Sequence, residues 1–505
     1  MTGRSGSTTC AASPRTAAVP PAVVPLYVLL LLLLALLLLA VVRLPWVGDL
    51  GLHAATVERL RHSLVSPGNP LVDADTPSPY YSPWTLVLGA LAKAGGGSVF
   101  VVLRCGALAG LTLLVTGVWA YVRTLSARRA APALALLCLT LLWGTDLFAW
   151  SGFLGLHSLA LTAAYPSVFA LGLSFHLWAG LTRVTGADRR AGWGAWLGLG
   201  VLWAVILLCH QFTGVVATLG ALATVLAARS GRAAWGRLAA GLLLGAIVLG
   251  AWPYYDFFAL SGAGSGLEDI HRSLYRDLPG RYWLVLLGVA ALAARRRRDR
   301  RDALVLFFAL GTLVCAAGGL SGHWSWGRAL PAALIPAQLA AALEAARVGS
   351  RAARAAWAGA LAVALAAGAW TQAGVLGYVV GRGTLPAAVE SRYREPWEGY
   401  HWITPWVRYG DVVMARTHPA RQIPAYGAYT VAPGYPDFFL PDEEERRAAT
   451  GRYFAEGTPA GERRDIEREY GVRWVVDRGL PPGAARGLRE VTGGPDGQVL
   501  YAVLP

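Results

Sequence analysis

The residues best placed to do chemistry lie in a polar segment that follows the most apolar run of the chain. Asp49 opens the segment "GDLGLHAATVERLRHSL", and His53 follows four residues later. Because residues four apart share one face of a helix, their side chains would lie together. A partly buried carboxylate here could act as a general base. The alternatives are structural: Asp49 could cap the free amides of a helix, and His53 could be an interfacial histidine bonded to a neighbour.

Two further acids, Asp73 and Asp75, lie in the proline-rich stretch "SPGNPLVDADTPSPYYSPW". They could contact a substrate or, together with Asp49, hold a divalent cation, because hard cations prefer oxygen ligands. A solvated turn is the alternative for both. No other cofactor is indicated, since the chain contains no HExxH motif, no Walker-type loop and no GxGxxG motif after a strand.

Basic side chains occur where a membrane protein rarely tolerates them. Arg328, in "HWSWGRALP", is expected at the outer end of a late apolar segment. An arginine at that depth is costly unless it is paired, binds a ligand or snorkels to the headgroups. Arg104 falls inside an apolar segment, where it would pair with an acid of the first outer loop or bind a ligand. His210 lies in a middle outer turn and is a further candidate for substrate contact.

The elements that must position these residues are membrane helices. The chain has 505 residues, of which 55% are hydrophobic and 15% charged, a balance unlike that of a water-soluble domain. The uncharged run at 22–42 is long enough to cross a bilayer and too long for the core of a signal peptide. We predict an all-α polytopic membrane protein with about eleven spans. They are expected at 22–42, 98–122, 131–147, 160–182, 193–209, 213–228, 236–252, 282–294, 303–320, 328–346 and 356–380.

The distribution of charge indicates the topology. The net charge is +15, yet residues 381–505 hold 16 arginines against 17 acidic residues, so the excess lies in short loops between apolar segments. This is the positive-inside pattern, and it argues against a nucleic-acid partner. Arginines cluster after every second span, at Arg123, Arg128, Arg129, Arg183, Arg189, Arg190, Arg229, Arg232, Arg237, 295–301, Arg347, Arg351 and Arg354. We therefore expect a cell-membrane protein with a cytoplasmic tail at 1–21, a transmembrane domain at 22–380 and an extracytoplasmic C-terminus.

Two outer regions are expected to carry structure of their own. The first outer loop, 43–97, should contain two interfacial helices, one at 51–64 and one in "YYSPWTLVLGALAKAGG", because both segments are amphipathic or too short to span. The C-terminal region, 381–505, reads as a small α/β or α+β domain. It combines a charged helix, "DEEERRAATGRYFAEG", with a short buried strand, Trp474–Val476.

Four stretches, taken in order, resemble the GT-C superfamily of integral-membrane glycosyltransferases. "GDLGLHAATVERLRHSL" with "PGNPLVDADTPSPYYSPWTLVLGALA" is similar to the first outer loop of those proteins, and "LLCHQFTGVVA" to a turn between two of their middle spans. "GRALPAALIPAQLAAAL" resembles their arginine-bearing late span, and "IEREYGVRWVVDRG" the end of their outer domain. The adjacent Asp-Glu pair of some protein-mannosylating members is absent from the first loop, as is the sequon-recognition motif of oligosaccharyltransferases.

The resemblance implies a sugar donor carried on polyprenyl phosphate and a glycan, lipid or protein acceptor outside the membrane, as in cell-envelope glycan synthesis. It makes Asp49 the expected base and His53, Asp73, Asp75, Arg104, His210 and Arg328 the expected substrate-binding residues. Arg328 would face the phosphate of the leaving group, because a guanidinium binds phosphate bidentately.

Two other classes of function fit a polytopic protein with an outer domain. A transporter or flippase of a lipid-linked glycan should carry polar residues near mid-membrane and often shows internal repeats, neither of which is evident. A noncatalytic assembly protein would use Asp49 only as a helix cap.

Overall fold

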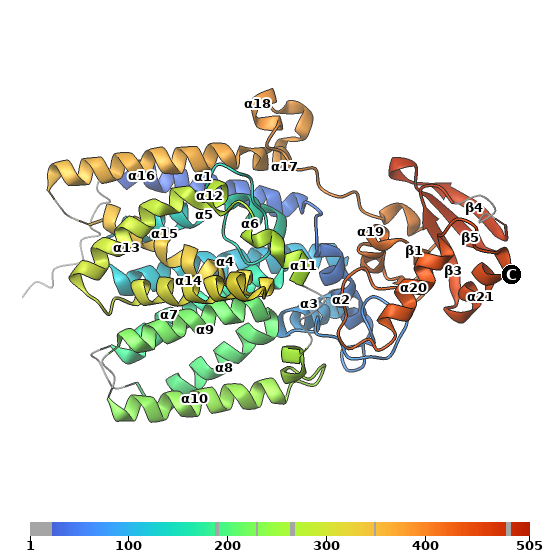
Figure 1. The fold of residues 1–505 in the computed structure, drawn as a ribbon, viewed down its shortest axis with the longest axis horizontal. Coiled ribbons are helices and arrows are strands. Elements are labelled where there is room, and N and C mark those ends of the chain that lie inside the picture. Colours follow the sequence, from blue (N-terminus) through green and yellow to red (C-terminus); the bar gives the residue numbers. More distant parts are fainter. Residues whose placement is uncertain are drawn as a thin grey trace, which may run out of the picture.

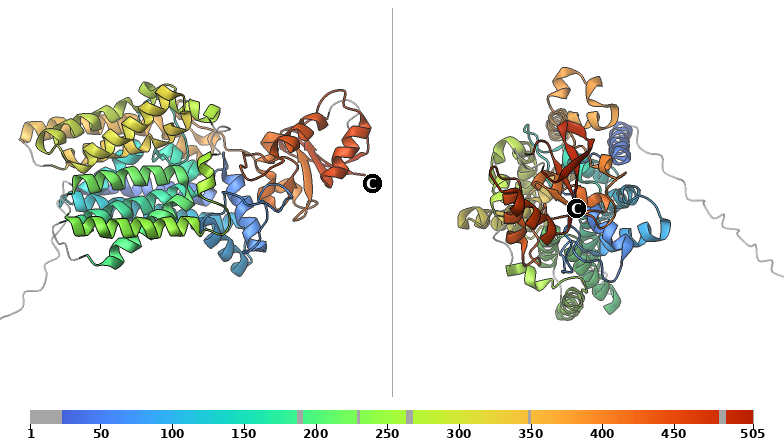
Figure 2. Two further views of the ribbon diagram at one scale, coloured as in Figure 1. Left: turned by 60° about the horizontal axis from the view of Figure 1, so that its bottom comes forward. Right: turned by 90° about the vertical axis from the view of Figure 1, so that its right-hand side faces the viewer.

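A long helical bundle and a smaller mixed α/β domain beyond one of its ends make up the computed structural model of the chain (Figure 1). The structure describes residues 23–186, 191–228, 231–262, 268–347, 350–480 and 486–504. The expected cytoplasmic tail, 1–21, and Arg189, Arg190 and Arg229 lie outside the described residues. Figure 2 shows the bundle helices side by side along the long axis and the C-terminal domain, hereafter the outer domain, projecting beyond them.

Each predicted span overlaps at least one helix in the described part of the chain. The bundle helices are α1 (Val24–Arg43), α4 (Val99–Leu125), α5 (Ala131–Leu141), α6 (Leu156–Thr162), α7 (Pro166–Thr185), α8 (Trp193–Cys209), α9 (Gln211–Ala227), α10 (Arg232–Gly250), α13 (Leu286–Arg298), α14 (Ala303–Ser321), α15 (Pro331–Ala345) and α16 (Arg351–Thr371). Short helices at the outer end of the bundle are α11 (Glu268–His271), α12 (Leu278–Tyr282), the 3-10 helix η6 (Trp324–Ala329), α17 (Gly377–Val380) and α18 (Ala387–Glu390).

The predicted number of spans is not confirmed. Among the described residues, five helices are long and apolar enough to cross a membrane, or seven if each of two bent pairs is one span. One bent pair is α6 with α7, which meet at 120° where Pro166 begins α7. Helix α5 has 11 residues and stops at Leu141, well before the predicted end at 147. Breaks of this kind depend on packing, which hydropathy does not record.

Helix α1 shows why these segments form a membrane bundle. Its 20 residues carry no charge before Arg43, and Pro25 lies in the first turn, where it causes no loss of an internal hydrogen bond. Leu30, Leu33 and Leu37 are buried against the bundle, whereas Leu29, Leu31 and Leu32 are each more than half exposed. A helix that is apolar on both its packed and its open faces belongs in hydrocarbon.

The first outer loop forms two helices, α2 (Leu50–His62) and α3 (Pro83–Gly95). Helix α3 leaves Val87 and Leu91 more than half exposed, as expected for a helix at the membrane interface. Helix α2, by contrast, packs on protein over most of its surface. Residues 50–57 of α2 are all buried, because the helix is enclosed by α3, α4 and the 3-10 helix η10 (Ile423–Tyr426) of the outer domain.

The outer domain is built on a five-stranded mixed sheet with the order β2-β1-β3-β5-β4. Its elements are β1 (Val412–Ala415), α19 (Thr417–Ala420), β2 (Tyr429–Thr430), α20 (Glu443–Tyr453), α21 (Ala460–Glu469), β3 (Val472–Asp477), β4 (Leu488–Gly493) and β5 (Val499–Val503). Strand β1 pairs in parallel with β2 and β3, and β5 pairs antiparallel with β3 and β4. The predicted charged helix and buried strand are confirmed as α20 and β3.

A buried arginine fastens the outer domain to α2. Arg59 is fully buried, and its guanidinium donates to the carbonyl oxygens of Gly427 at 2.9 Å and Ala428 at 2.5 Å. The same guanidinium lies 3.6 Å from the ring centroid of Tyr429 and 4.8 Å from that of Tyr409. Charge-assisted hydrogen bonds of this kind are stronger than neutral ones, so Arg59 anchors the outer domain to α2.

Arg59→Met is expected to loosen the outer domain, because two buried carbonyl groups lose their donors. The cost should be about 3 kcal/mol of the free energy that holds the domain on α2. Hydrogen exchange of backbone amides in 423–430 would show it as faster exchange. Arg61→Met, on the more exposed side of the same helix, serves as the control and should leave exchange unchanged. Equal exchange in both variants would contradict the role assigned to Arg59.

Candidate active site

The backbone that carries Asp49 is held from two directions. The hydroxyl of Tyr165, at the start of α7, donates to the carbonyl of Val47, and the hydroxyl of Tyr435, in the outer domain, donates to that of Gly48 at 2.7 Å. Gly48 has a φ of +59°, which glycine adopts without steric cost. The turn before α2 is therefore fixed by residues from both the bundle and the outer domain.

Asp49 occupies the N-cap position of α2, but its side chain caps nothing. Its φ and ψ are −80° and 7°, away from the extended conformation usual for a capping residue, and its carboxylate accepts no capping hydrogen bond. Within the described part of the chain the carboxylate has no hydrogen-bond or ion-pair partner. The capping interpretation of Asp49 is wrong, and its charge is left available to something outside the helix.

The carboxylate faces a cavity of about 610 Å³ at the junction of the bundle and the outer domain. Its walls come from the turn before α2, α2 itself, the start of α7, the α8–α9 turn, η6 and the outer domain. Four of the predicted site residues line this one cavity: Asp49, His53, His210 and Arg328. Aromatic side chains supply much of the remaining wall, among them Tyr80, Trp150, Phe212 and Tyr435.

Arg328 is a buried cation, and no carboxylate among the described residues is bonded to it. It is 7% exposed, and its Nε has no hydrogen-bond partner in that part of the chain. The guanidinium carbon lies 4.6 Å from the ring centroid of Phe212 and 5.8 Å from that of Trp150. Burial lowers the pKa of Arg328 to about 10, which leaves the group charged at neutral pH, and the negative charge of Asp49 favours that form. Burial of a charge that has no ion-pair partner is energetically costly, so this site favours the binding of an anion.

His210 directs a second donor to the same point. Its Nδ1 accepts a hydrogen bond from the Thr213 amide at 3.1 Å and so caps α9. With that lone pair engaged, the neutral ring carries its proton on Nε2, which lies 3.3 Å from Nη2 of Arg328. Burial, with the nearby charge of Arg328, lowers the pKa of His210 well below its usual value. Two donors therefore lie side by side, and one anion beside them could accept hydrogen bonds from both.

The electrostatics of Asp49 suit a proton acceptor. Burial raises the pKa of Asp49 above its ordinary value, and the positive charges of Arg328 and Arg421 oppose part of that rise. His53 stays neutral, because burial lowers its pKa to about 3. The His53 ring lies edge-on to Tyr165, with centroids 4.8 Å apart, so it shapes the wall beside Asp49.

Three predicted site residues lie elsewhere. Asp73 and Asp75 are exposed on the loop between α2 and α3 and do not line the cavity. Arg104, in α4, donates from Nε to the Val42 carbonyl of α1 at 2.9 Å and also lies outside it. These three residues therefore do not share the cavity with Asp49, and their contact with a substrate stays a prediction. The loop holding the two acids is turned outward by Asn69, whose side-chain oxygen binds the amides of Leu71 and Val72.

Arg421 was not predicted as a site residue. It follows α19 in the outer domain and lines the cavity near Asp49, with its Nε bonded to the Gly434 carbonyl at 3.1 Å. Gly51 permits this approach, since a Cβ there would lie 2.0 Å from the Arg421 carbonyl oxygen. No local pattern in the sequence marks this arginine, which reaches Asp49 only through the docking of two distant segments.

A divalent cation was the one cofactor suggested by the acids of the first loop. Within the described residues, no group of three or more His, Cys, Asp or Glu side chains could hold a metal ion. Asp49 stands apart from the two exposed acids that would have completed such a site.

Known proteins share this architecture at the level of structure and not of sequence. No protein-family model matches the chain, and no curated protein matches it significantly. The arabinofuranosyltransferase AftD from Mycobacteria superimposes with a TM-score of 0.57 at 17% identity over 94% of this chain, which spans only 40% of the length of AftD. ArnT from Cupriavidus metallidurans matches with a TM-score of 0.54 at 15% identity, over 95% of this chain and 98% of ArnT.

The chain thus has the fold of the GT-C integral-membrane glycosyltransferases, as the order of its sequence motifs predicted. ArnT bound to undecaprenyl phosphate gives an equivalent match, with a TM-score of 0.53 at 15% identity over 94% of this chain and 97% of that one.

Proposed function

We propose that the protein is a membrane glycosyltransferase that moves a sugar from a polyprenyl-phosphate donor to an acceptor hydroxyl outside the cell membrane. The observation that carries the proposal is the placement on one cavity of a carboxylate, Asp49, and a buried guanidinium, Arg328, neither of which has an ion-pair partner among the described residues. The likeness to ArnT, which has been seen bound to undecaprenyl phosphate, supports a lipid-linked donor.

The reaction assigns each group a role. Asp49 takes the proton of the acceptor hydroxyl, and the acceptor oxygen attacks the anomeric carbon of the sugar. The bond between that carbon and the phosphate oxygen breaks, and polyprenyl phosphate leaves with the electron pair. Arg328, with the Nε2–H of His210, stabilises the charge that develops on the phosphate.

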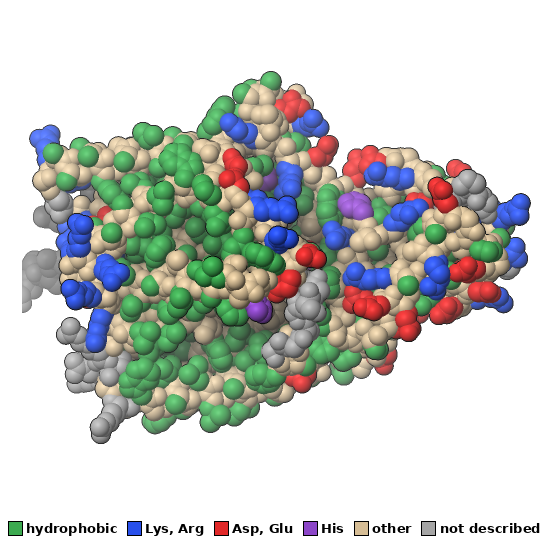
Figure 3. Space-filling model, in the orientation of Figure 1, with side chains coloured by type: hydrophobic (Ala, Val, Ile, Leu, Met, Phe, Trp, Pro, Cys, Tyr) green, Lys and Arg blue, Asp and Glu red, His purple; other side chains and the backbone are tan. Residues whose placement is uncertain are grey.

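The placement of charge favours transfer over transport. One group of basic side chains lies at the end of the bundle away from the outer domain, on the face seen in Figure 3. Arginines in the short loops at that end fit an N-terminus in the cytoplasm and a cavity at the outer surface. Asp49, His210 and Arg328 gather at that outer end, whereas a carrier is expected to hold such groups near the middle of the membrane.

The test is transfer by the purified protein in lipid nanodiscs. Donors are polyprenyl phosphates carrying labelled pentoses or hexoses, acceptors are cell-envelope glycans and lipids, and nucleotide sugars serve as control donors. We expect labelled product and free polyprenyl phosphate in equal amounts from one lipid-linked donor and none from nucleotide sugars. Movement of the donor across vesicle membranes, without cleavage of its sugar–phosphate bond, would establish a flippase instead.

The pH dependence should report the Asp49 carboxylate. A base must be ionised, so kcat/KM falls as pH drops through the pKa of Asp49, and burial moves that fall above the pH at which an ordinary aspartate titrates. Arg421→Gln removes a charge that lowers this pKa, so the acid limb should shift to higher pH. Arg408→Gln, an exposed change in the same domain, is the control. If the acid limb of the kcat/KM profile did not shift in Arg421→Gln, Arg421 would have no influence on the pKa of Asp49.

A further inference from the structure

A second cavity, of about 360 Å³, is formed by helix ends that face away from the outer domain. Figure 1 shows these ends of the bundle. The cavity is formed by the end of α4 and the residues that follow it, the end of α13, the turn before α14 and the end of α15. Its charged lining consists of Arg128, Arg295, Arg298, Arg347, Asp299, Asp302 and Glu344. None of these residues takes part in the proposed transfer.

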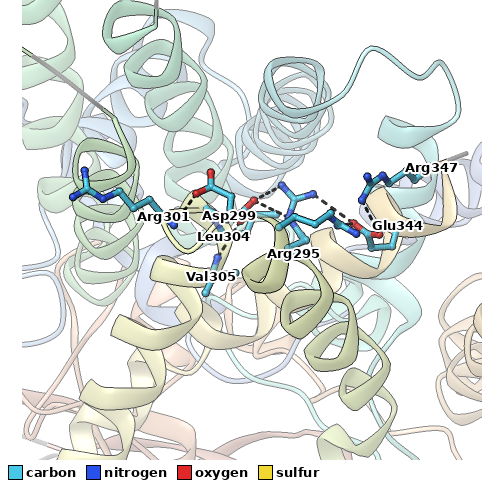
Figure 4. Close-up of polar contacts among 9 residues, drawn as sticks. Arg295, Asp299, Arg301, Leu304, Val305, Glu344 and Arg347 are labelled. Carbon is cyan, nitrogen blue, oxygen red and sulfur yellow. Dashed lines mark hydrogen bonds and ion pairs between the residues drawn. The ribbon is translucent and has the colours of Figure 1, made fainter. Parts of the chain in front are cut away.

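Asp302 is fully engaged by the protein itself. One carboxylate oxygen caps α14 by accepting from the amides of Leu304 at 2.9 Å and Val305 at 3.2 Å. The other accepts from Nε and Nη2 of Arg295, at 3.0 and 2.6 Å (Figure 4). This pair therefore fixes the α13–α14 turn and leaves no acceptor for other cations in the cavity.

Glu344 is shared among three guanidinium groups. Arg298 bonds to its Oε1, and Arg295 and Arg347 approach its two oxygens at 3.8 Å (Figure 4). Its side chain is 13% exposed, whereas that of Arg347 is 52% exposed. Arg295 is already held by Asp302, and Glu344 bonds most closely to Arg298. Arg347 approaches Glu344 only to 3.8 Å and is exposed, so it keeps most of its capacity to bind an anion.

Arg128 adds a cation with no partner. Its guanidinium has no hydrogen bond or ion pair within the described part of the chain. Only its backbone is bonded: the amide donates to the Ser126 hydroxyl, and the carbonyl accepts from the Ala131 amide. Asp299 uses one oxygen to bind the Arg301 amide at 2.9 Å. In this cavity Arg128 and Arg347 are therefore the guanidinium groups that remain available as donors, because Arg295 and Arg298 are held in ion pairs.

The position of the cavity indicates which anion it binds. It lies where α4 ends and α14 begins, and both helices are long enough to span a membrane. The ends of such helices lie at the depth of lipid headgroups. Guanidinium groups bind phosphate in forked pairs, and basic pockets between membrane helices are suited to anionic headgroups. We infer that this cavity binds the phosphate group of an anionic membrane lipid.

The test compares lipids on the full-length protein in detergent. Phosphatidylglycerol, phosphatidylcholine and inorganic phosphate are titrated separately, and binding is followed by native mass spectrometry and by the thermal unfolding midpoint. We expect phosphatidylglycerol to bind and raise Tm, and the other two to have little effect. In the double variant Arg128→Gln/Arg347→Gln, affinity for phosphatidylglycerol should fall on the order of 20-fold, while Glu344 keeps Arg295 and Arg298 as partners.

The control is Arg296→Gln/Arg300→Gln, which removes two exposed charges from the same end of the bundle but not from the cavity. It should keep the affinity of the unaltered protein. If both double variants lost the same affinity for phosphatidylglycerol, general surface charge would explain the binding and the inference would be overturned. An equal response to phosphatidylcholine or to inorganic phosphate would also overturn it, because the lipid phosphate would then not be what the cavity selects.

Discussion

Asp49→Asn is expected to reduce the rate of sugar transfer about 10²- to 10⁴-fold, the usual contribution of a positioned general base. Asparagine has nearly the same shape as aspartate and can also cap a helix, so α2 and the cavity should be retained. Asparagine cannot, however, take the proton from the hydroxyl of the sugar acceptor. Because the Asp49 carboxylate has no partner within the described residues and caps no amide, little stability should be lost with it.

Transfer of labelled sugar under single-turnover conditions measures this effect, and binding of the polyprenyl-phosphate donor, measured separately, should change little. Asp73→Asn is the matched control, since Asp73 is an exposed acid of the same loop that lies outside the cavity, and its rate should equal that of the unaltered protein. A normal rate in Asp49→Asn would remove the catalytic assignment and leave Asp49 without a function.

Arg328→Gln is expected to slow transfer about 10²- to 10³-fold, the cost of removing one donor that stabilises developing charge. The donor's phosphate should also bind less well, because the charge that balances it is lost. Arg328→Lys restores a positive charge without the forked geometry and should recover only part of the rate. This graded order, unaltered protein above lysine above glutamine, is specific to an arginine that contacts the leaving group.

The measurement is the affinity for polyprenyl phosphate together with the rate of the chemical step. Arg276→Gln controls for charge on the outer surface, because Arg276 is exposed and does not line the cavity. If Arg328→Lys and Arg328→Gln behaved alike and both unfolded at lower temperature, the residue would serve packing against Phe212 and Trp150. Unchanged donor binding in a folded Arg328→Gln variant would exclude contact with phosphate.

The two halves of the site differ in how far the sequence could reveal them. Asp49 and His53 share one short polar segment, and Arg328 interrupts an apolar stretch, so each is conspicuous beside its neighbours. Arg421 sits among loop residues with no distinguishing pattern, and it acts on Asp49 only because Gly51 and Arg59 bring α2 against the outer domain. Asp73 and Asp75 show the converse: their residue type suggested chemistry, but both are exposed on their loop and lie outside the cavity.

The sequence by itself determined the membrane bundle, the order of its apolar helices and the segment from which a catalytic carboxylate could come, because hydropathy and charge act over short stretches of chain. The tertiary structure decided which helices are broken, that Asp49 leaves its helix end uncapped, and that Arg328, His210 and Arg421 meet around it. Burial and long-range contacts set those outcomes: the free energy of a buried charge depends on what lies opposite it in space, and neighbours in sequence do not specify that.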